Sequence, residues 1–373
     1  MEDHAGRMDA FRRRLERLHA DAYWLVNADN VRYLCGFRGE DSTLLLTAGR
    51  AVLITDSRYV EQAEREAQVD EVVSRHTPMV QAVGSLCRAL AVRRLAVTGA
   101  NLTHAQFLAL AEAAPALNLT VRREGLAEAM RRRKDAGEVA LIRAAIGTAE
   151  AAFLAVARDM KSGWTEGATV ARLEYEMRLR GADGAAFETT CAAGANASVP
   201  HALAGETEIG AGEGLLMDWG ARRDGYCCDL TRMICLDRIP ARLEALVEIV
   251  LEAQTAAFDR LKPGTTCGEA DAAGRSVIAR AGYGNCFGHG IGHGVGLAVH
   301  EGPGLAPRSE TVLLPGMVVT VEPGIYLPGE AGVRIEDMAL VTADGHEVLT
   351  TLPRRPGDVQ ALVRGSAAES AGS

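Results

Sequence analysis

Residues 287–301 combine glycine and histidine in a way that restricts the backbone to strand or loop. The segment reads FGHGIGHGVGLAVHE, with five glycines at every second position from 288 to 296 and histidines at His289, His293 and His300. Each glycine costs a helix about 1 kcal/mol relative to alanine, so a stable helix is excluded here. In a strand alternate side chains share a face, so His289 and His293 point the same way. His300 lies an odd number of residues from both, and a bend or bulge must reorient it.

Three histidines beside so many glycines favour a metal or catalytic site. Glycine lets a metal, a substrate or another backbone approach closely. A phosphate-binding loop is the weaker interpretation, because a GxGxxG loop needs a helix that opens directly after it, and no helical pattern follows. A single histidine could simply lie in a surface loop or be a core residue whose ring nitrogens are hydrogen-bonded. The metal interpretation therefore requires further ligands elsewhere in the chain.

Length, charge and cysteine usage exclude several classes of protein. The 373 residues suffice for two domains, and the formal net charge of −9 is unsuited to nucleic acid, whose phosphates need a basic surface. The N-terminus lacks the basic and apolar parts of a signal peptide, and no uninterrupted run of about 18 apolar residues is present to span a membrane. The eight cysteines form no CxxC pair, which fits buried thiols in a reducing compartment. We therefore expect a cytoplasmic protein without nucleic-acid or membrane partners.

The hydrophobic pattern predicts two domains and a tail. Residues 1–127 read as an α/β domain that begins with an amphipathic helix around Phe11 and Leu15. Its strands are expected at 22–26, 43–47, 51–55, 94–99 and 117–123, with a helix at 104–114. Residues 128–357 read as an α+β domain with a long helix at 134–160, glycine-punctuated strands, and helices near 240–261 and 267–281. The chain ends in the small, polar sequence RGSAAESAGS, and we expect residues 358–373 to be disordered.

Two predicted hairpins carry acidic residues within apolar runs. In GLLMDWGARRDGYCCDLTR, a four-residue loop at 222–225 would place Asp218 directly opposite Asp229. The alternative is a register shifted by one residue, which would turn one aspartate to solvent. In VVTVEPGIYLPGEAGVRIEDMALV, Glu322 and Glu336 are equidistant from Gly329 and form a second facing pair. Like charges opposite each other in an apolar setting are destabilising, so both pairs predict a bound cation.

Four carboxylates and one imidazole suit two divalent cations. Shared carboxylates that hold two metals recur in aminopeptidases, where they activate water and polarise a carbonyl. The oxygen-rich set favours Mn(II), with Co(II), Fe(II) and Zn(II) as alternatives.

With these residues identified, nearly the whole chain resembles the proline-specific peptidases of the pita-bread fold, aminopeptidase P and Xaa-Pro dipeptidase (prolidase). The order of motifs carries the resemblance: Asp218, Asp229 eleven residues later, HGIGHGVGLAVHE, EPG from Glu322, and RIED from Arg334. The N-terminal region resembles the creatinase-type domain through NVRYLCGF at 30–37 and TDSRYVEQA at 55–63. The resemblance implies a dimetal hydrolase that cleaves the Xaa-Pro bond at the N-terminus of short peptides or in dipeptides.

The resemblance also implies roles for single residues. The metal ligands would be Asp218, Asp229, His293, Glu322 and Glu336, with Asp229 and Glu336 shared between both ions. Three histidines would lie near the substrate and stabilise its tetrahedral intermediate, namely His201, His289 and His300. Arg334 would hold ligand carboxylates, and Glu322 is our candidate for moving the proton of the attacking water to the leaving nitrogen. In such relatives the N-terminal domain helps to form a homodimer and to roof the active site.

Several rival interpretations share parts of this pattern. Methionine aminopeptidase has the same five ligands but usually lacks the large N-terminal domain and the histidine that matches His289. Creatinase has both domains without the full ligand set, and pita-bread proteins that only bind a partner lose ligands, whereas all five are present here. The choice between aminopeptidase P and dipeptidase stays open, as does a hydrolase of some non-peptide amide.

Overall fold

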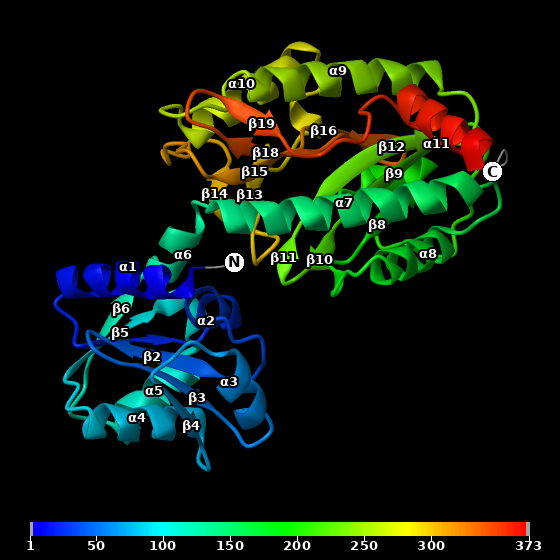
Figure 1. Cartoon of the computed structure of the whole chain (residues 1–373). Coiled ribbons are helices and arrows are strands. Elements are labelled where there is room, and N and C mark those ends of the chain that lie inside the picture. Colours follow the sequence, from blue (N-terminus) through cyan, green and yellow to red (C-terminus); the bar gives the residue numbers. More distant parts are fainter. Residues whose placement is uncertain (1–2, 371–373) are drawn as a thin grey trace. The chain divides into compact units, whose positions relative to one another are not determined.

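A computed structural model describes residues 3–370 and divides the chain into two compact units, Met1–Arg131 and Arg132–Ser373 (Figure 1). The N-terminal unit contains one six-stranded sheet in the order β4-β3-β2-β1-β5-β6. Its strands are β1 Ala22–Leu25, β2 Thr43–Thr47, β3 Ala51–Thr55, β4 Glu71–Ser74, β5 Arg94–Thr98 and β6 Asn118–Arg122. Its helices are α1 His4–Arg17, α2 Ala28–Cys35, α3 Val60–Glu66, α4 Met79–Ala89, α5 His104–Ala113 and α6 Leu126–Arg131, with the 3₁₀ turn η1 Gly99–Asn101.

The apolar runs recognised in the sequence form the middle of this sheet. Strands β1, β2 and β3 pair antiparallel, while β4, β5 and β6 are added by parallel pairing. Residues of β1 and β3 are buried on both faces, which explains why these strands are continuously apolar rather than alternating. The α/β class expected for this part of the chain is confirmed.

The second unit surrounds several short sheets with helices. Its helices are α7 Ala136–Asp159, α8 Glu166–Leu179, α9 Ala241–Phe258, α10 Cys267–Arg280 and α11 Pro356–Ser370. Its strands are β7 Gly184–Ala185, β8 Thr190–Ala193, β9 Gly214–Trp219, β10 Ala221–Arg223, β11 Tyr226–Cys227, β12 Leu230–Cys235, β13 Gly292–Gly294, β14 Glu301–Leu305, β15 Val318–Val321, β16 Gly324–Leu327, β17 Ala331–Arg334, β18 Asp337–Val341 and β19 His346–Val348, with 3₁₀ turns η2 Gly194–Ser198 and η3 Gly284–Cys286. Helices α9 and α10 cover one side of the strands, and α7 and α8 cover the other (Figure 1).

Helix α7 is long and apolar enough to cross a membrane by length and composition alone. Half of its most apolar stretch is buried inside the structure, and Asp135 caps its first turn through a capping box with Glu138. The core helix of a soluble protein has the same properties, so this helix is weak evidence for a membrane span.

The first hairpin differs from the sequence prediction by two residues. Asp224 and Gly225 alone form the turn, with φ of 47° and 72°, as the tight turn between two paired strands requires. Asp218 therefore pairs with Thr231, and the predicted direct pairing of Asp218 with Asp229 is wrong. Because the shift is an even number of residues, both aspartates still lie on the same face, one diagonal step apart.

The second hairpin has the predicted register. The ladders β15–β18 and β16–β17 pair residues that are equidistant from Gly329, such as Val321 with Asp337 and Gly324 with Arg334. Glu322 and Glu336 occupy the break between the two ladders in the same register. A bridge between Thr231 and Glu336 joins this hairpin to the first one.

The end of the chain differs from the expected disorder. Helix α11 covers Pro356–Ser370, so a helix occupies most of the segment 358–373, and residues 371–373 lie outside the described residues. Val359 is buried, and the side-chain amide of Gln360 donates to the carbonyl oxygens of Leu236 and Asp237. These contacts hold the helix against the rest of the unit. The prediction of disorder rested on the polar composition of the last residues, which does not show these contacts.

Replacing Gly332 by alanine should destabilise the second unit. A Cβ at this position would overlap the carbonyl oxygen of Ala197, which is backbone and cannot rotate away. Overpacking of this kind costs about 1–3 kcal/mol, which lowers the midpoint of thermal unfolding by about 2–12 °C for a unit of this size. Gly345→Ala is the control, because a Cβ there meets nothing within 4 Å. Equal melting temperatures for both variants would contradict the packing argument.

Candidate metal centre

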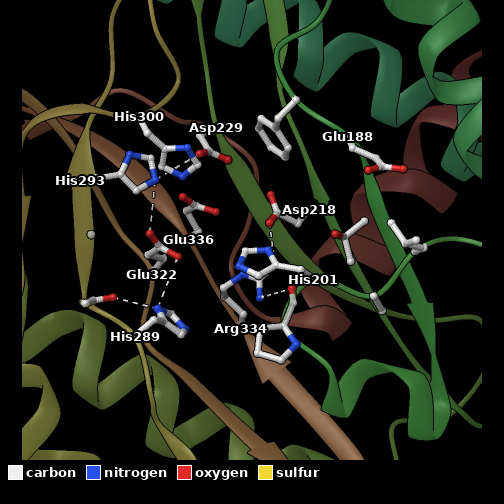
Figure 2. Close-up of a pocket in the computed structure, with 17 residues that line it drawn as sticks. Glu188, His201, Asp218, Asp229, His289, His293, His300, Glu322, Arg334 and Glu336 are labelled. Carbon is white, nitrogen blue, oxygen red and sulfur yellow. Dashed lines mark hydrogen bonds and ion pairs between the residues drawn. The ribbon is translucent and has the colours of Figure 1, made fainter. Parts of the chain in front are cut away.

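The structure brings all nine predicted site residues to the wall of one cavity of about 380 Å³ (Figure 2). They are His201, Asp218, Asp229, His289, His293, His300, Glu322, Arg334 and Glu336. They come from the first hairpin, the second hairpin, the histidine segment and the loop after η2. The rest of the wall includes residues that sequence reasoning did not find, among them Phe187, Glu188, Thr190, Pro200 and Leu203.

Carboxylates and one imidazole meet in the wall of this cavity. Nε2 of His293 lies 3.5 Å from Oδ2 of Asp229 and 3.4 Å from Oε1 of Glu322. One ligand atom from each of Asp229, His293 and Glu336 fits within 4.8 Å of the other two. This spacing lets one ion contact all three side chains.

Unsatisfied oxygens show that the site fits a cation. Oδ1 of Asp218, Oδ1 of Asp229 and Oε1 of Glu336 are buried and have no hydrogen-bond partner. A buried polar atom without a partner is unfavourable, and three of them around one cavity call for a common ligand. Carboxylate oxygens with a single imidazole are a donor set for divalent metals.

Burial changes the ionisation of the acidic residues. It raises the pKa of Glu322 to about 7 and raises the pKa values of Asp229 and Glu336 well above their usual range. The neighbouring carboxylates act in the same direction on all three. Without a cation the site therefore holds protons, and a metal that binds there must replace them.

The three histidines of the segment 287–301 are neutral at physiological pH. Burial lowers the pKa of His289 and of His293 to about 4, and it also lowers the pKa of His300. A register shift between His293 and Gly294 supplies the bulge expected from the sequence. It brings the rings of His293 and His300 to a centroid distance of 4.2 Å. His293 is thus available as a ligand, and His300 lies beside it at the exposed side of the cavity.

Arg334 links the two hairpins through its guanidinium group. Nη2 donates to Oδ2 of Asp218 at 2.5 Å, and Nε donates to Oγ1 of Thr231 at 3.0 Å. The Thr231 hydroxyl in turn donates to Oε2 of Glu336 at 2.7 Å. Sequence reasoning missed Thr231, although its place two residues after Asp229 puts it on the same face of the chain.

Tyr326 fixes the hydrogen-bonding state of His289. Nη1 of Arg334 donates to the Tyr326 hydroxyl at 2.8 Å, so the hydroxyl proton is left for Nε2 of His289, 3.0 Å away. Nδ1 of His289 then carries the ring proton and donates to the carbonyl oxygen of Gly290 at 2.8 Å. This tautomer follows from the donor inventory, since a guanidinium group cannot accept a hydrogen bond.

A buried polar side chain holds the backbone beside both glutamates. The side-chain amide of Gln254, on α9, donates to the carbonyl oxygens of Val321 and Ile335 at 3.0 and 3.2 Å. These residues directly precede Glu322 and Glu336. Gln254 thereby holds the backbone at the break between the two ladders of the second hairpin.

Comparison with known proteins places both parts of the chain in described families. Residues 140–343 match metallopeptidase family M24, and residues 7–132 match the creatinase/prolidase N-terminal domain. An uncharacterized peptidase of Bacillus subtilis is 35% identical over 93% of this chain and 98% of its own length.

Two solved structures are similar over almost their whole length. The Xaa-Pro dipeptidase from Bacillus anthracis has a TM-score of 0.90 and 38% identity, covering 95% of this chain and 99% of that chain. The X-Pro aminopeptidase from Thermotoga maritima has a TM-score of 0.85 and 35% identity, covering 92% and 99%. The expected fold, a creatinase-like domain followed by a pita-bread domain, is confirmed.

Stabilisation of the protein by a divalent metal should increase with pH. A metal must displace protons from Glu322, whose pKa is about 7, and from Asp229 and Glu336, whose pKa values are raised further by burial. Thermal unfolding of chelator-treated protein, with and without Mn(II), should therefore show a larger metal-dependent shift at about pH 8 than at about pH 6. In Glu336→Gln this shift should largely disappear.

The metal-free protein should lose stability as the pH rises through about 7. A carboxyl group with a raised pKa makes the folded protein bind more protons than the unfolded chain, so unfolding free energy falls as pH rises through about 7. The histidines have the opposite effect, but only between about 4 and 6.5. Above that range, metal-free protein that gains stability with pH would contradict the assignment.

Proposed function

The chain belongs to metallopeptidase family M24, and we propose that it hydrolyses the Xaa-Pro bond at the N-terminus of short peptides or in dipeptides, using two divalent metal ions. Membership of this family implies that the protein binds divalent metal. The observation that carries the proposal is the set of unsatisfied buried carboxylate oxygens of Asp218, Asp229 and Glu336 around one cavity. The solved relatives whose names specify the Xaa-Pro bond support the choice of substrate.

Five side chains would hold the metal ions. Asp218, Asp229, His293, Glu322 and Glu336 are our candidates, and all of them line the cavity. By the family resemblance, Asp229 and Glu336 would be shared between both ions. Ligand atoms of these two residues and of His293 lie within 4.8 Å of one another, which is consistent with this assignment. The oxygen-rich set favours Mn(II), with Co(II), Fe(II) or Zn(II) as alternatives.

Glu322 is our candidate for proton transfer. Metal ions of this kind lower the pKa of water and polarise a carbonyl group when they are bound. Glu322 would accept the proton of the attacking water and pass it to the leaving nitrogen, which has no proton of its own in an Xaa-Pro bond. Its carboxylate lies between His293 and His289, with Oε2 3.8 Å from Nδ1 of His289. This position faces both the proposed metals and the substrate side of the cavity.

Two exposed histidines are our candidates for stabilising the oxygen of the carbonyl group that is attacked. His300 and His201 are exposed at the cavity, where an N–H group can donate to the oxygen that gains charge during the attack. His289 is held by Tyr326 and Gly290, so it would form a fixed wall that positions the substrate. Arg334 would keep Asp218 oriented toward the metal.

Recognition of proline would depend on shape. The Xaa-Pro bond is a tertiary amide and offers no N–H group for the enzyme to hold. Phe187, Pro200 and Leu203 supply apolar surface to the cavity beside the polar cluster. A ring of fixed geometry can be selected by such surface without a hydrogen bond.

The proposal includes a cytoplasmic homodimer. All eight cysteines are free and seven of them are buried, as suits a reducing compartment. The dimer is inferred from the resemblance to creatinase-type proteins. Light scattering at micromolar concentration tests it, and a mass equal to that of a single chain would contradict the dimer.

Metal-dependent cleavage of proline peptides is the first test. Chelator-stripped protein should be inactive, and added Mn(II) should restore release of the first residue from Ala-Pro, from Ala-Pro-Ala, or from both. Cleavage of the dipeptide alone would identify a dipeptidase, and cleavage of the tripeptide an aminopeptidase P. Met-Ala-Ser is the control and should stay intact. Cleavage of none of the peptides by metal-loaded protein would refute the proposed function.

Glu322→Gln should remove most turnover. The substitution keeps the shape of the side chain but removes the group that accepts the proton, and loss of general base catalysis lowers kcat by about 10²–10⁴-fold. The metal content of the variant should be measured alongside, since Glu322 is also a proposed ligand. Glu330→Gln is the control, because Glu330 is exposed and its ion pair with Arg242 is likewise exposed. Unchanged kcat in Glu322→Gln would rule out the proton-transfer role.

A further inference from the structure

Glu166 is a buried carboxylate that the proposed mechanism does not use. It is the first residue of α8, and its exposed fraction is 1%. Among the described side chains, no cation forms an ion pair with it, so its charge is balanced only by neutral donors. Burial of a carboxylate without a cation is unfavourable unless several hydrogen bonds compensate for the lost water. The positions of its hydrogen-bond donors therefore indicate which segments Glu166 holds together.

The donors lie at the two ends of one segment. Oε1 accepts from the backbone N–H of Ala193 at 2.7 Å and from the side-chain amide of Asn196 at 3.0 Å. Oε2 accepts from the backbone N–H of Gly205 at 3.2 Å. The segment 193–205, which we call the η2 loop, leaves β8, forms η2 and returns toward α8. The carboxylate thus joins the two ends of the η2 loop, beside a backbone hydrogen bond in which the N–H of Gly167 donates to the carbonyl oxygen of Gly205 at 2.9 Å.

The η2 loop also lies against the second hairpin. Oγ of Ser198 accepts from the backbone N–H of Gly329 at 3.2 Å. Nη1 of Arg334 donates to the carbonyl oxygen of Pro200 at 3.2 Å. The loop is therefore held at its base by Glu166 and in its middle by the same arginine that orients Asp218.

The middle of the η2 loop forms one wall of the cavity. Pro200, His201, Ala202 and Leu203 all line it. Leu203 is 72% exposed and lines the cavity, so it offers apolar surface to a substrate side chain. None of the donors to Glu166 belongs to this wall, so Glu166 can act on the cavity only through the loop.

We propose that Glu166 is a positioning residue for the substrate: by closing the base of the η2 loop, it sets His201 and Leu203 at the distance from the metal ligands that an Xaa-Pro peptide requires. This inference rests on the proposed function. Glu166 contacts none of the proposed ligands, so its loss should weaken the use of substrate and leave the binding of metal unchanged. Displacement of the η2 loop should therefore raise KM, while the affinity for metal stays the same.

Glu166→Ala and Glu166→Gln test the inference. In Glu166→Ala, KM for the cleaved proline peptide should rise by about tenfold or more, because small displacements of substrate-positioning groups have large effects. The affinity for Mn(II), measured by calorimetry, should stay within about twofold of the original protein. Glu166→Gln keeps one acceptor oxygen and should give an intermediate KM, which provides a folded variant if the alanine variant does not fold.

Glu150→Ala is the matched control. Glu150 is also a buried carboxylate, 7% exposed, and it accepts from the backbone N–H groups of Thr351 and Leu352 and from the Thr351 hydroxyl. Glu150, Thr351 and Leu352 do not line the cavity. Loss of Glu150 should lower the melting temperature without raising KM. An equal rise of KM in this control, or an unchanged KM in Glu166→Ala, would overturn the positioning role.

Hydrogen exchange separates failure of this inference from failure of the proposed function. Backbone amides in 193–205 should exchange faster in both Glu166 variants than in the original protein, while the same amides stay protected in Glu150→Ala. This measurement needs no turnover. If the original protein cleaves no proline peptide, the proposed function fails, and unchanged protection of the η2 loop in the variants would independently refute the anchoring by Glu166.

Discussion

The concentration of negative charge in one buried cavity is the constraint on which the second unit depends. Asp229, Glu322 and Glu336 are pushed toward their protonated forms by burial, and oxygens of Asp218, Asp229 and Glu336 have no partner. Such a cluster is stable only with protons or cations in it. Stability and activity are therefore coupled, because the ions that complete the site are also those that a metallopeptidase uses.

Much of the surrounding structure serves to hold these acids at fixed positions. Thr231 is central, since it pairs with Asp218 on one side, bridges to Glu336 on the other, and accepts from Arg334. Gln254 fixes the backbone before both glutamates from α9. The candidate ligands on the two hairpins are thus held in place, because neutral donors and one guanidinium group hydrogen-bond to their side chains or to the backbone beside them.

Local patterns predicted most of the fold and of the site. The apolar runs predicted five of the six strands of the N-terminal sheet and missed β4, and the symmetry about Gly329 predicted the register of the second hairpin. The register of the first hairpin was missed because Asp224 and Gly225 form the whole turn, although the even shift kept both aspartates on one face. Contacts of Val359 and Gln360 order α11, and no local pattern near the end of the chain shows them.

By itself, the sequence determined which residues are available for the site and which face of each strand carries them, because side-chain alternation and glycine spacing are local properties of the backbone. Only the tertiary structure decided which atoms meet. The partners of Thr231, the tautomer of His289 and the anchoring of the η2 loop by Glu166 depend on contacts between segments far apart in the chain. Such contacts arise when separate elements pack around one core, and the spacing of residues along the chain does not specify them.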